Sequence, residues 1–313
     1  MGLRAFVPGY VRLLESGELR DRARKARELL RECCVCPRRC AANRLEGEKG
    51  TCRVGAEPVV SSFGPHFGEE SPLVGRSGSG TIFFTDCNLR CVFCQNSDIS
   101  HGAQGEAVSV EVLASMMLQL QQRGCHNVNL VSPTHQVPAI LSAITLAAEK
   151  GLTAPIVYNT GGYDSVETLG ILDGAVDIYM PDCKYSDNAT AQRLSGVKEY
   201  ADRNREAVAE MHRQVGDLVC DERGIAQRGL LVRHLVLPND LAGTAEVMKF
   251  LASLSRNTYV NIMAQYRPCY RAMEFEELSQ PVTASEYGRA VSQAREAGLQ
   301  RFDERPKILR AWL

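Results

Sequence analysis

Residues 85–96 read TDCNLRCVFCQN and place Cys87, Cys91 and Cys94 on one short loop, directly after the apolar residues 81–84. The spacing Cys-x3-Cys-x2-Cys lets three sulfurs converge on one site, and thiolates suit iron–sulfur clusters, zinc and copper(I). Structural zinc commonly takes four protein ligands, whereas a cubane cluster held by three cysteines keeps one iron free for another ligand. The odd number of thiols therefore favours an open 4Fe-4S cluster over structural zinc with a distant fourth ligand.

The composition also favours a metal-binding role for the cysteines. The chain has 313 residues and 12 cysteines. No stretch approaches the roughly 18 consecutive apolar residues of a membrane helix, and the N-terminus lacks the apolar core of a signal peptide. We therefore expect a cytoplasmic protein without a membrane partner, in which thiols stay reduced. Clustered cysteines in such a protein are more often metal or cluster ligands than disulfides.

The charge balance argues against one class of partner. Lysines and arginines number 36 against 37 acidic residues, which gives a net charge of -1. No overall positive field attracts nucleic acid, so we expect no nucleic-acid partner. The charge indicates nothing specific about the substrate.

From residue 77 onward, apolar runs alternate with amphipathic stretches of helical spacing, a pattern typical of repeated βα units. The runs are nearly continuous, as expected for buried parallel strands. The expected strands are residues 81–85, 127–131, 155–158, 177–180, 230–237 and 259–263. The expected helices are residues 111–122, 138–149, 165–172, 198–214, 245–253 and 285–297. Two helix starts carry the pattern of a capping box, Asp164 with Glu167 and Thr283 with Glu286.

Six βα units predict an α/β protein whose parallel strands either close partly into a barrel or form an open doubly wound sheet. The sequence alone leaves this choice open. Both arrangements place ligands at the carboxyl ends of the strands, so the residues that follow each strand matter most. The three cysteines of residues 87–94 follow the first expected strand.

The residues before this repeat have a different character. Residues 13–30 have the pattern of a charged amphipathic helix, residues 32–55 are rich in cysteine, and residues 74–80 resemble a Gly/Ser linker. We expect an N-terminal helix with a cysteine-rich metal or cluster module at residues 1–76. The βα core then covers residues 77–277, and a helical extension covers residues 278–313.

The motif CNLRCVFC, with the aromatic Phe93 before its last cysteine, resembles the signature of radical S-adenosylmethionine (SAM) enzymes. The resemblance implies a partial (β/α)6 TIM-like barrel with a 4Fe-4S cluster on Cys87, Cys91 and Cys94. It implies that SAM chelates the fourth iron, and that one electron cleaves SAM to methionine and a 5'-deoxyadenosyl radical. This radical abstracts hydrogen from a substrate. It further implies an electron donor such as flavodoxin or ferredoxin.

The resemblance covers about residues 78–277 and looks closest to relatives of the pyruvate formate-lyase activating enzyme, and among them to PflX-type iron–sulfur proteins. That wider family commonly has a Gly-Gly-Glu type turn after the second strand, whereas residues 131–135 here read VSPTH. The departure leaves the Ser132 and Thr134 hydroxyls as candidate acceptors for the SAM amine. His135 is more often structural at such a position.

Further expected cofactor contacts follow later strands. Asn159 and Thr160 begin NTGGY, which resembles an Asp-Thr-Asn-Gly-aromatic turn of the activating enzymes. Asp182 and Lys184 match an Asp-x-Lys pattern, in which the lysine meets the cofactor carboxylate or closes a structural salt bridge. Arg233 lies inside an apolar strand, where its charge needs a partner, and the cofactor carboxylate is our candidate.

A second cysteine group has the spacing Cys33-x2-Cys36-x3-Cys40-x11-Cys52. These four thiols would complete a tetrahedral ligand set for zinc or hold an auxiliary iron–sulfur cluster. The alternative is a set of reduced cysteines packed as small apolar side chains, which makes a poor core beside several arginines.

Two other features face the expected mouth of the barrel. Cys183 and Cys269 are expected to be packed by default, with a thiyl radical or a covalent adduct as the alternative. Residues 263–271, rich in aromatic residues and arginine, are expected to form part of the substrate wall. The alternative is a solvated loop that covers apolar surface.

The sequence thus predicts a radical SAM oxidoreductase or modifying enzyme that acts on an unidentified small molecule or protein. A glycyl-radical enzyme activase is the runner-up, although the second cysteine group precedes the barrel, unlike the ferredoxin-type insert of some activases. A non-catalytic metal-binding adaptor is the alternative from another class, and it would have no reason to bind SAM.

Overall fold

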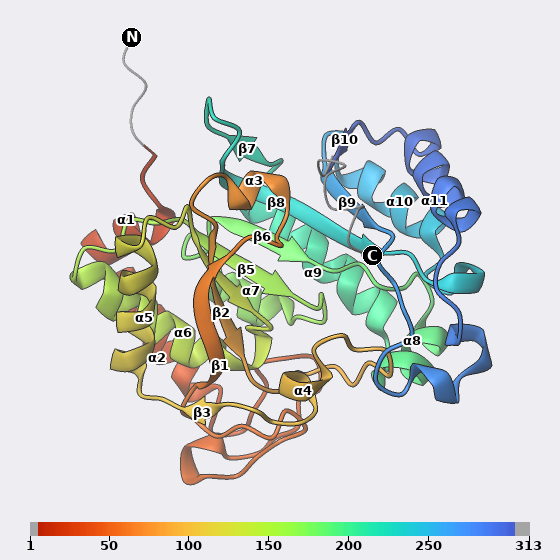
Figure 1. Ribbon diagram of the computed structural model, residues 1–313. Coiled ribbons are helices and arrows are strands. Elements are labelled where there is room, and N and C mark those ends of the chain that lie inside the picture. The colour runs from red at the N-terminus through yellow and green to blue at the C-terminus, as the bar shows by residue number, and fades with distance from the viewer. Residues whose placement is uncertain (1–5, 304–313) are drawn as a thin grey trace.

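A mixed β-sheet forms the centre of the computed structural model, which describes residues 6–303 (Figure 1). Its strand order is β10-β9-β8-β6-β5-β4-β2-β1-β3, and β7 pairs with β8. The strands are β1 Val59–His66, β2 Ser79–Phe84, β3 Glu106–Ala107, β4 Val128–Val131, β5 Ile156–Thr160, β6 Ile178–Pro181, β7 Val219–Cys220, β8 Ala226–Leu235, β9 Tyr259–Met263 and β10 Arg301–Phe302.

The six expected strands are present as β2, β4, β5, β6, β8 and β9, and they pair in parallel. The centre of the sheet is buried on both faces, which explains the continuous apolar runs. β8 begins at Ala226, before the expected residue 230, and the two-residue β10 adds an unexpected parallel strand. The sheet stays open between β3 and β10, so the expected α/β class with a partial barrel is confirmed.

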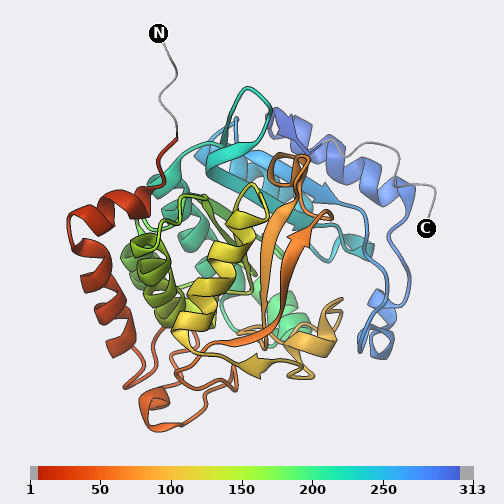
Figure 2. The same cartoon turned by 60° about the vertical axis from the view of Figure 1, so that its left-hand side comes forward.

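Helices cover the sheet on both sides (Figures 1 and 2). The α-helices are α1 Gly9–Glu15, α2 Glu18–Glu28, α3 Ser71–Val74, α4 Ser97–Ser100, α5 Val110–Gln122, α6 Val137–Glu149, α7 Val166–Leu172, α8 Asn188–Ser195, α9 Tyr200–Val215, α10 Thr244–Leu254 and α11 Ala284–Glu296. Short 3-10 helices are η1 Arg44–Glu46, η2 Thr134–Gln136, η3 Pro238–Asp240, η4 Ala272–Glu274 and η5 Glu276–Leu278. Across residues 6–303, every helix falls short of the length and apolar character that crossing a membrane requires.

Two local expectations were wrong. Residues 13–30 form two helices instead of one, because Gly17 adopts φ 82° and ends the first helix before α2 begins. The cap of α7 is Ser165, whose hydroxyl accepts a hydrogen bond from Thr168 N, whereas the expected cap Asp164 is buried among hydroxyl groups. The expected capping box of Thr283 with Glu286 is confirmed at α11.

The sheet extends across the expected boundary at residue 76. β1 pairs antiparallel with β2, from Val60 opposite Phe84 to His66 opposite Ser79. The expected linker at residues 74–80 contains the end of α3 and the start of β2. The three-domain division remains a prediction, and residues 304–313 of the expected C-terminal extension lie outside the described residues.

Asp177 attaches the N-terminal helices to the sheet. Its Oδ1 accepts from Gly9 N and its Oδ2 from Ile156 N, each at 2.9 Å. Nearby, the Tyr10 hydroxyl donates to Ala154 O at 2.8 Å. Helix α2 then packs along α6, so this layer covers one face of the sheet and leaves the carboxyl ends of the strands free for a site.

Candidate functional site

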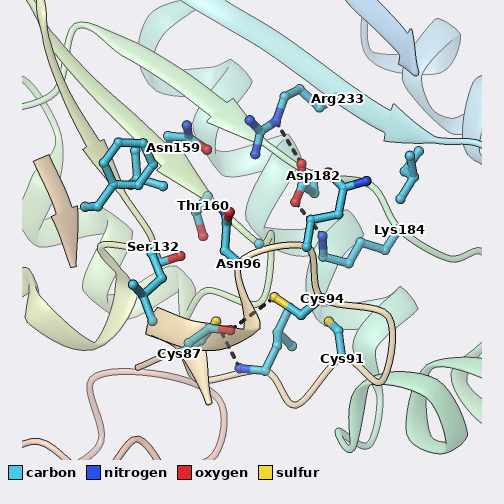
Figure 3. A pocket seen from close by; sticks show the side chains of 18 of the residues that line it. Cys87, Cys91, Cys94, Asn96, Ser132, Asn159, Thr160, Asp182, Lys184 and Arg233 are labelled. Atoms are coloured by element: carbon cyan, nitrogen blue, oxygen red, sulfur yellow. Dashed lines mark hydrogen bonds and ion pairs between the residues drawn. The ribbon is translucent and has the colours of Figure 1, made fainter. Parts of the chain in front are cut away.

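A cavity of about 340 Å³ lies at the carboxyl ends of the parallel strands (Figure 3). Its lining comes from the loop after β2 and from the ends of β4, β5, β6, β8 and β9. The lining includes these predicted residues: Cys87, Cys91, Phe93, Cys94, Ser132, Asn159, Thr160, Asp182, Lys184 and Arg233. The structure therefore brings together residues that the sequence spreads over about 150 positions.

The three thiols lie side by side at one end of the cavity (Figure 3). Leu89 N donates to Cys87 Sγ at 3.4 Å, and the Cys91 and Cys94 sulfurs each lie 3.0 Å from a serine hydroxyl. Backbone bonds from Arg90 N and Val92 N to the end of α8, both 2.9 Å, fix the course of the loop. The loop is thus ordered by the protein itself.

Burial determines the protonation of these thiols. It raises the pKa of Cys87, and it raises the pKa of Cys91 to about 12 although the nearby Lys184 acts in the opposite direction. Both are neutral thiols at pH 7 in the absence of a metal. Iron would convert them to thiolates, and the neighbouring Lys184 suits the negative charge that results. Three convergent thiols beside a cation fit a 4Fe-4S cluster.

Asp182 joins the two cations of the cavity. Its Oδ2 lies 2.5 Å from Lys184 Nζ, and its Oδ1 accepts from Arg233 Nε at 2.9 Å (Figure 3). Burial opposes the charged carboxylate, but Arg233 and Lys184 together lower the pKa of Asp182 below its usual value. The cofactor carboxylate was the expected partner of Arg233; the structure provides Asp182 instead. A cofactor contact of Arg233 remains a prediction.

Thr134 differs from the other expected cofactor residues because it does not line the cavity. Its hydroxyl donates to Asp164 Oδ1 at 2.7 Å, and Thr160 donates to Asp164 Oδ2 at 2.6 Å. The Tyr158 hydroxyl donates to the same carboxylate at 2.9 Å. Thr134 therefore belongs to a buried network behind the cavity wall, whereas Ser132 faces the cavity.

Residues 161 and 162 have different reasons to be glycine. Gly162 adopts φ 77°, and a Cβ there would lie 2.2 Å from the Asp182 carbonyl oxygen. Gly161 lines the cavity, and a Cβ there would meet the Leu89 side chain at 2.7 Å. The backbone requires glycine at 162, and the cavity wall favours it at 161.

Sequence reasoning missed His66 and Glu69, which also line the cavity. They come from the end of β1 and the turn after it, and His66 Nδ1 lies 2.9 Å from Glu69 Oε1. This contact raises the pKa of His66 above its usual value. The available signal was the β-rich sequence at residues 59–63, which marks a strand before the expected boundary.

The expected mouth residues are only partly brought to the site. Met263 and Gln265 line the cavity, and Tyr266 packs edge-on against Phe93 with ring centroids 5.9 Å apart. Cys183 is buried outside the lining, and Cys269 is half-buried outside it. The structure thus gives Cys183 its default packing role.

The second cysteine group lines a separate cavity of about 10 Å³, to which Cys33, Cys36, Cys40 and Cys52 all contribute. Within residues 6–303, no three His, Cys, Asp or Glu side chains stand in ready geometry for one metal ion. His135, from η2, lines the same small cavity. Burial lowers the pKa of His135 to about 3, so its ring is neutral.

Comparisons with known proteins agree with the site. Residues 81–223 match the model of the radical SAM superfamily. The uncharacterized protein MJ0674 of Methanocaldococcus jannaschii is 34% identical over 283 residues, which cover 88% of this chain and 77% of that protein. This chain belongs to the radical SAM superfamily, whose members are enzymes that use a 4Fe-4S cluster and SAM.

Solved structures share the fold at low sequence identity. The FeFe-hydrogenase maturase HydG from Carboxydothermus hydrogenoformans matches with a TM-score of 0.52 and 12% identity, over 74% of this chain and 54% of that one. A radical SAM methyltransferase from Sphaerobacter thermophilus has a TM-score of 0.48 and 16% identity, over 71% of this chain and 66% of that one. This chain therefore spans about half the length of HydG. The expected closeness to PflX-type proteins remains an expectation from the motifs.

Proposed function

We propose that this protein is an oxidoreductase or modifying enzyme that starts radical chemistry on a substrate in the 340 Å³ cavity. The observation that carries the proposal is the convergence of Cys87, Cys91 and Cys94 with polar strand-end residues on that one cavity. When bound there, the cluster and SAM would supply a 5'-deoxyadenosyl radical at the expense of one electron from a donor such as flavodoxin or ferredoxin.

In this proposal the three cysteines hold the cluster, and Phe93 shields it. The Phe93 ring packs edge-on against Tyr185 and Tyr266, with centroid distances of 6.4 and 5.9 Å. These buried rings keep water away from that side of the loop. A dry wall protects a reactive radical from side reactions.

The strand ends would orient SAM. Ser132, Asn159 and Thr160 present hydroxyl and amide groups to the cavity, and Lys184 and Arg233 present positive charge. A carboxylate such as that of methionine suits such cations, because charge-assisted hydrogen bonds are stronger than neutral ones. Asp182 holds both cations in place before any ligand arrives.

We infer that the substrate uses the part of the cavity beside His66 and Glu69. The two side chains form a hydrogen-bonded pair within the lining, and Glu69 also lies in the field of Arg233. A carboxylate and an imidazole are suited to bind a polar group and to move a proton. This favours a substrate with a polar or ionisable group near the hydrogen that is removed.

The experiment is cleavage of SAM by anaerobically reconstituted protein reduced with dithionite. The parent should form 5'-deoxyadenosine, and the variant with Cys87, Cys91 and Cys94 replaced by alanine should lose both the product and the iron–sulfur absorbance. Cys220→Ala is a matched control, because Cys220 is half-buried on β7 and does not line the cavity. Unchanged cleavage in the triple variant would contradict the proposal.

A further inference from the structure

The small cavity beside the barrel site collects donor atoms from distant parts of the chain. Cys33, Cys36, Cys40 and Cys52 come from the segment before β1, and His135 comes from the turn after β4. Backbone bonds fold the segment back on itself, since Cys33 N donates to Ala42 O at 3.0 Å and Ala41 N donates to Cys33 O at 3.1 Å. Four thiols and one imidazole therefore face one space.

Gly50 admits one of these thiols. A Cβ at position 50 would lie only 2.3 Å from Cys40 Sγ, so any larger residue would displace that sulfur. The backbone at Cys40 is turned sharply, with φ 42° at Arg39 and φ 58° at Ala41. The segment is shaped around the position of the Cys40 thiol.

His135 provides an independent observation. The side chain is 2% exposed, and its Nε2 lies 2.9 Å from the Thr85 carbonyl oxygen, to which it donates. Its other ring nitrogen, Nδ1, is buried and has no hydrogen-bond partner. An imidazole that donates one N–H to a backbone carbonyl and keeps its other lone pair open has the configuration of a metal ligand.

Arg44 also indicates negative charge at this place. Its guanidinium is 2% exposed and donates to Gly55 O at 2.7 and 3.0 Å and to Cys33 Sγ at 3.7 Å. Among the described residues, no carboxylate forms an ion pair with it. A buried charge without a counter-charge is costly, and neutral thiols do not supply one. Metal-bound thiolates carry a net negative charge and would compensate Arg44.

We propose that Cys33, Cys36, Cys40, Cys52 and His135 are the donor set of a zinc centre, separate from the barrel site. The side chains do not yet stand in closed geometry, so the ion would draw four of the five donors into a tetrahedral shell. A cavity of about 10 Å³ suits a single ion better than a cube of iron and sulfide. The centre does not depend on the proposed reaction of the barrel.

The test uses the full chain with Cys87, Cys91 and Cys94 replaced by alanine, so that the second site is measured alone. After incubation with Zn²⁺ and removal of unbound metal, elemental analysis should find about one zinc per chain. Further replacement of Cys36 and Cys40 by alanine leaves three donors and should remove this zinc. Cys34→Ala is the matched control, because this half-buried thiol lies in the same segment outside the cavity lining.

Co²⁺ gives a second measurement that does not depend on the folding of a variant. Bound in place of Zn²⁺, it should show intense thiolate-to-cobalt absorbance in the protein with the intact N-terminal cysteines. Equal zinc in the Cys36/Cys40 variant and the control would overturn the proposal. So would a centre that takes up iron and sulfide instead of zinc, or the absence of thiolate absorbance with Co²⁺.

Discussion

Arg233 and Asp182 form a buried ion pair that joins β8 to the end of β6, with Arg233 Nε 2.9 Å from Asp182 Oδ1. Asp182 also binds Lys184, so one carboxylate neutralises one of two cations in the cavity wall. Burial disfavours the charged guanidinium, yet Asp182 and the more distant Glu70 and Glu69 raise the pKa of Arg233 further. The pair stabilises the charged forms of both partners before a ligand binds.

Replacement of Arg233 should therefore lower stability as well as cofactor affinity. Arg233→Met leaves Asp182 with Lys184 alone, so we expect the free energy of unfolding to fall by about 1 to 3 kcal/mol, less than for a buried charge left without any partner. Urea unfolding of the anaerobic protein measures this change. In a double-mutant cycle with Asp182→Asn, the two losses should not add. Unchanged unfolding with weakened SAM binding would show that the cofactor is the main partner of Arg233.

The two glycines after β5 should respond differently to alanine. Gly162→Ala places a Cβ against backbone and forces a residue at φ 77°, so it should lower the unfolding free energy by more than about 1 kcal/mol. Gly161→Ala should cost little stability, because its Cβ meets only the movable Leu89 side chain. Thermal melting compares the two variants. Equal melting temperatures would contradict the distinction.

The parallel core could be predicted from the sequence because its signal is local. Strands buried on both faces read as continuous apolar runs, and β9 begins and ends at the expected residues 259 and 263. Site residues were found where they directly follow such runs, as Asp182 and Lys184 follow β6. The carboxyl ends of parallel strands meet at one edge, so residue position was enough to bring them together.

Other parts depend on tertiary contacts that no local pattern specifies. His66 reaches the cavity because β1 pairs antiparallel with β2, and this pairing crosses an apparent linker. Asp164 precedes a helix and has Glu167 three residues later, which is the pattern of a cap. The hydroxyls of Thr134, Thr160 and Tyr158 bind its carboxylate instead, and Ser165 takes the cap position. Buried hydrogen bonds here prevail over a weaker local preference.

Asp177 should make the stability depend on pH. Burial raises its pKa to about 7, whereas in the unfolded chain the value is about 3.9. Between these values the folded protein holds a proton that the unfolded chain has lost, so the contribution of this group to stability falls as pH rises from about 4 to about 7.

Urea unfolding at pH 5 and pH 8 measures this effect. The parent should lose more stability over this interval than Asp177→Asn, which stays neutral throughout, by up to a few kcal/mol. Tyr179→Phe is a suitable control, because it removes a buried hydroxyl of β6 that bonds Gln214 and leaves Asp177 in place. Its pH dependence should match the parent. A parent profile as flat as that of Asp177→Asn would mean that Asp177 stays charged in the fold.

Arg38 connects the N-terminal cysteine group to the three-cysteine loop. Its Nε donates to Asn88 O at 2.5 Å, and its Nη2 donates to Gly196 O at 3.0 Å, beside the helix end that also fixes Arg90. Asn88 directly follows Cys87, so these bonds hold one side of the proposed cluster loop. Arg38→Ala should loosen the loop and expose its iron to chelators.

The expected result is a several-fold faster loss of iron–sulfur absorbance when reconstituted protein is treated with EDTA under anaerobic conditions. Arg39→Ala is the matched control, because the neighbouring arginine pairs with Glu167 on the exposed surface and makes no printed contact to the loop in the described structure. A surface ion pair of this kind contributes little to stability. If both variants lose iron at the parent rate, Arg38 does not position the loop, and the two cysteine groups are independent in the folded protein.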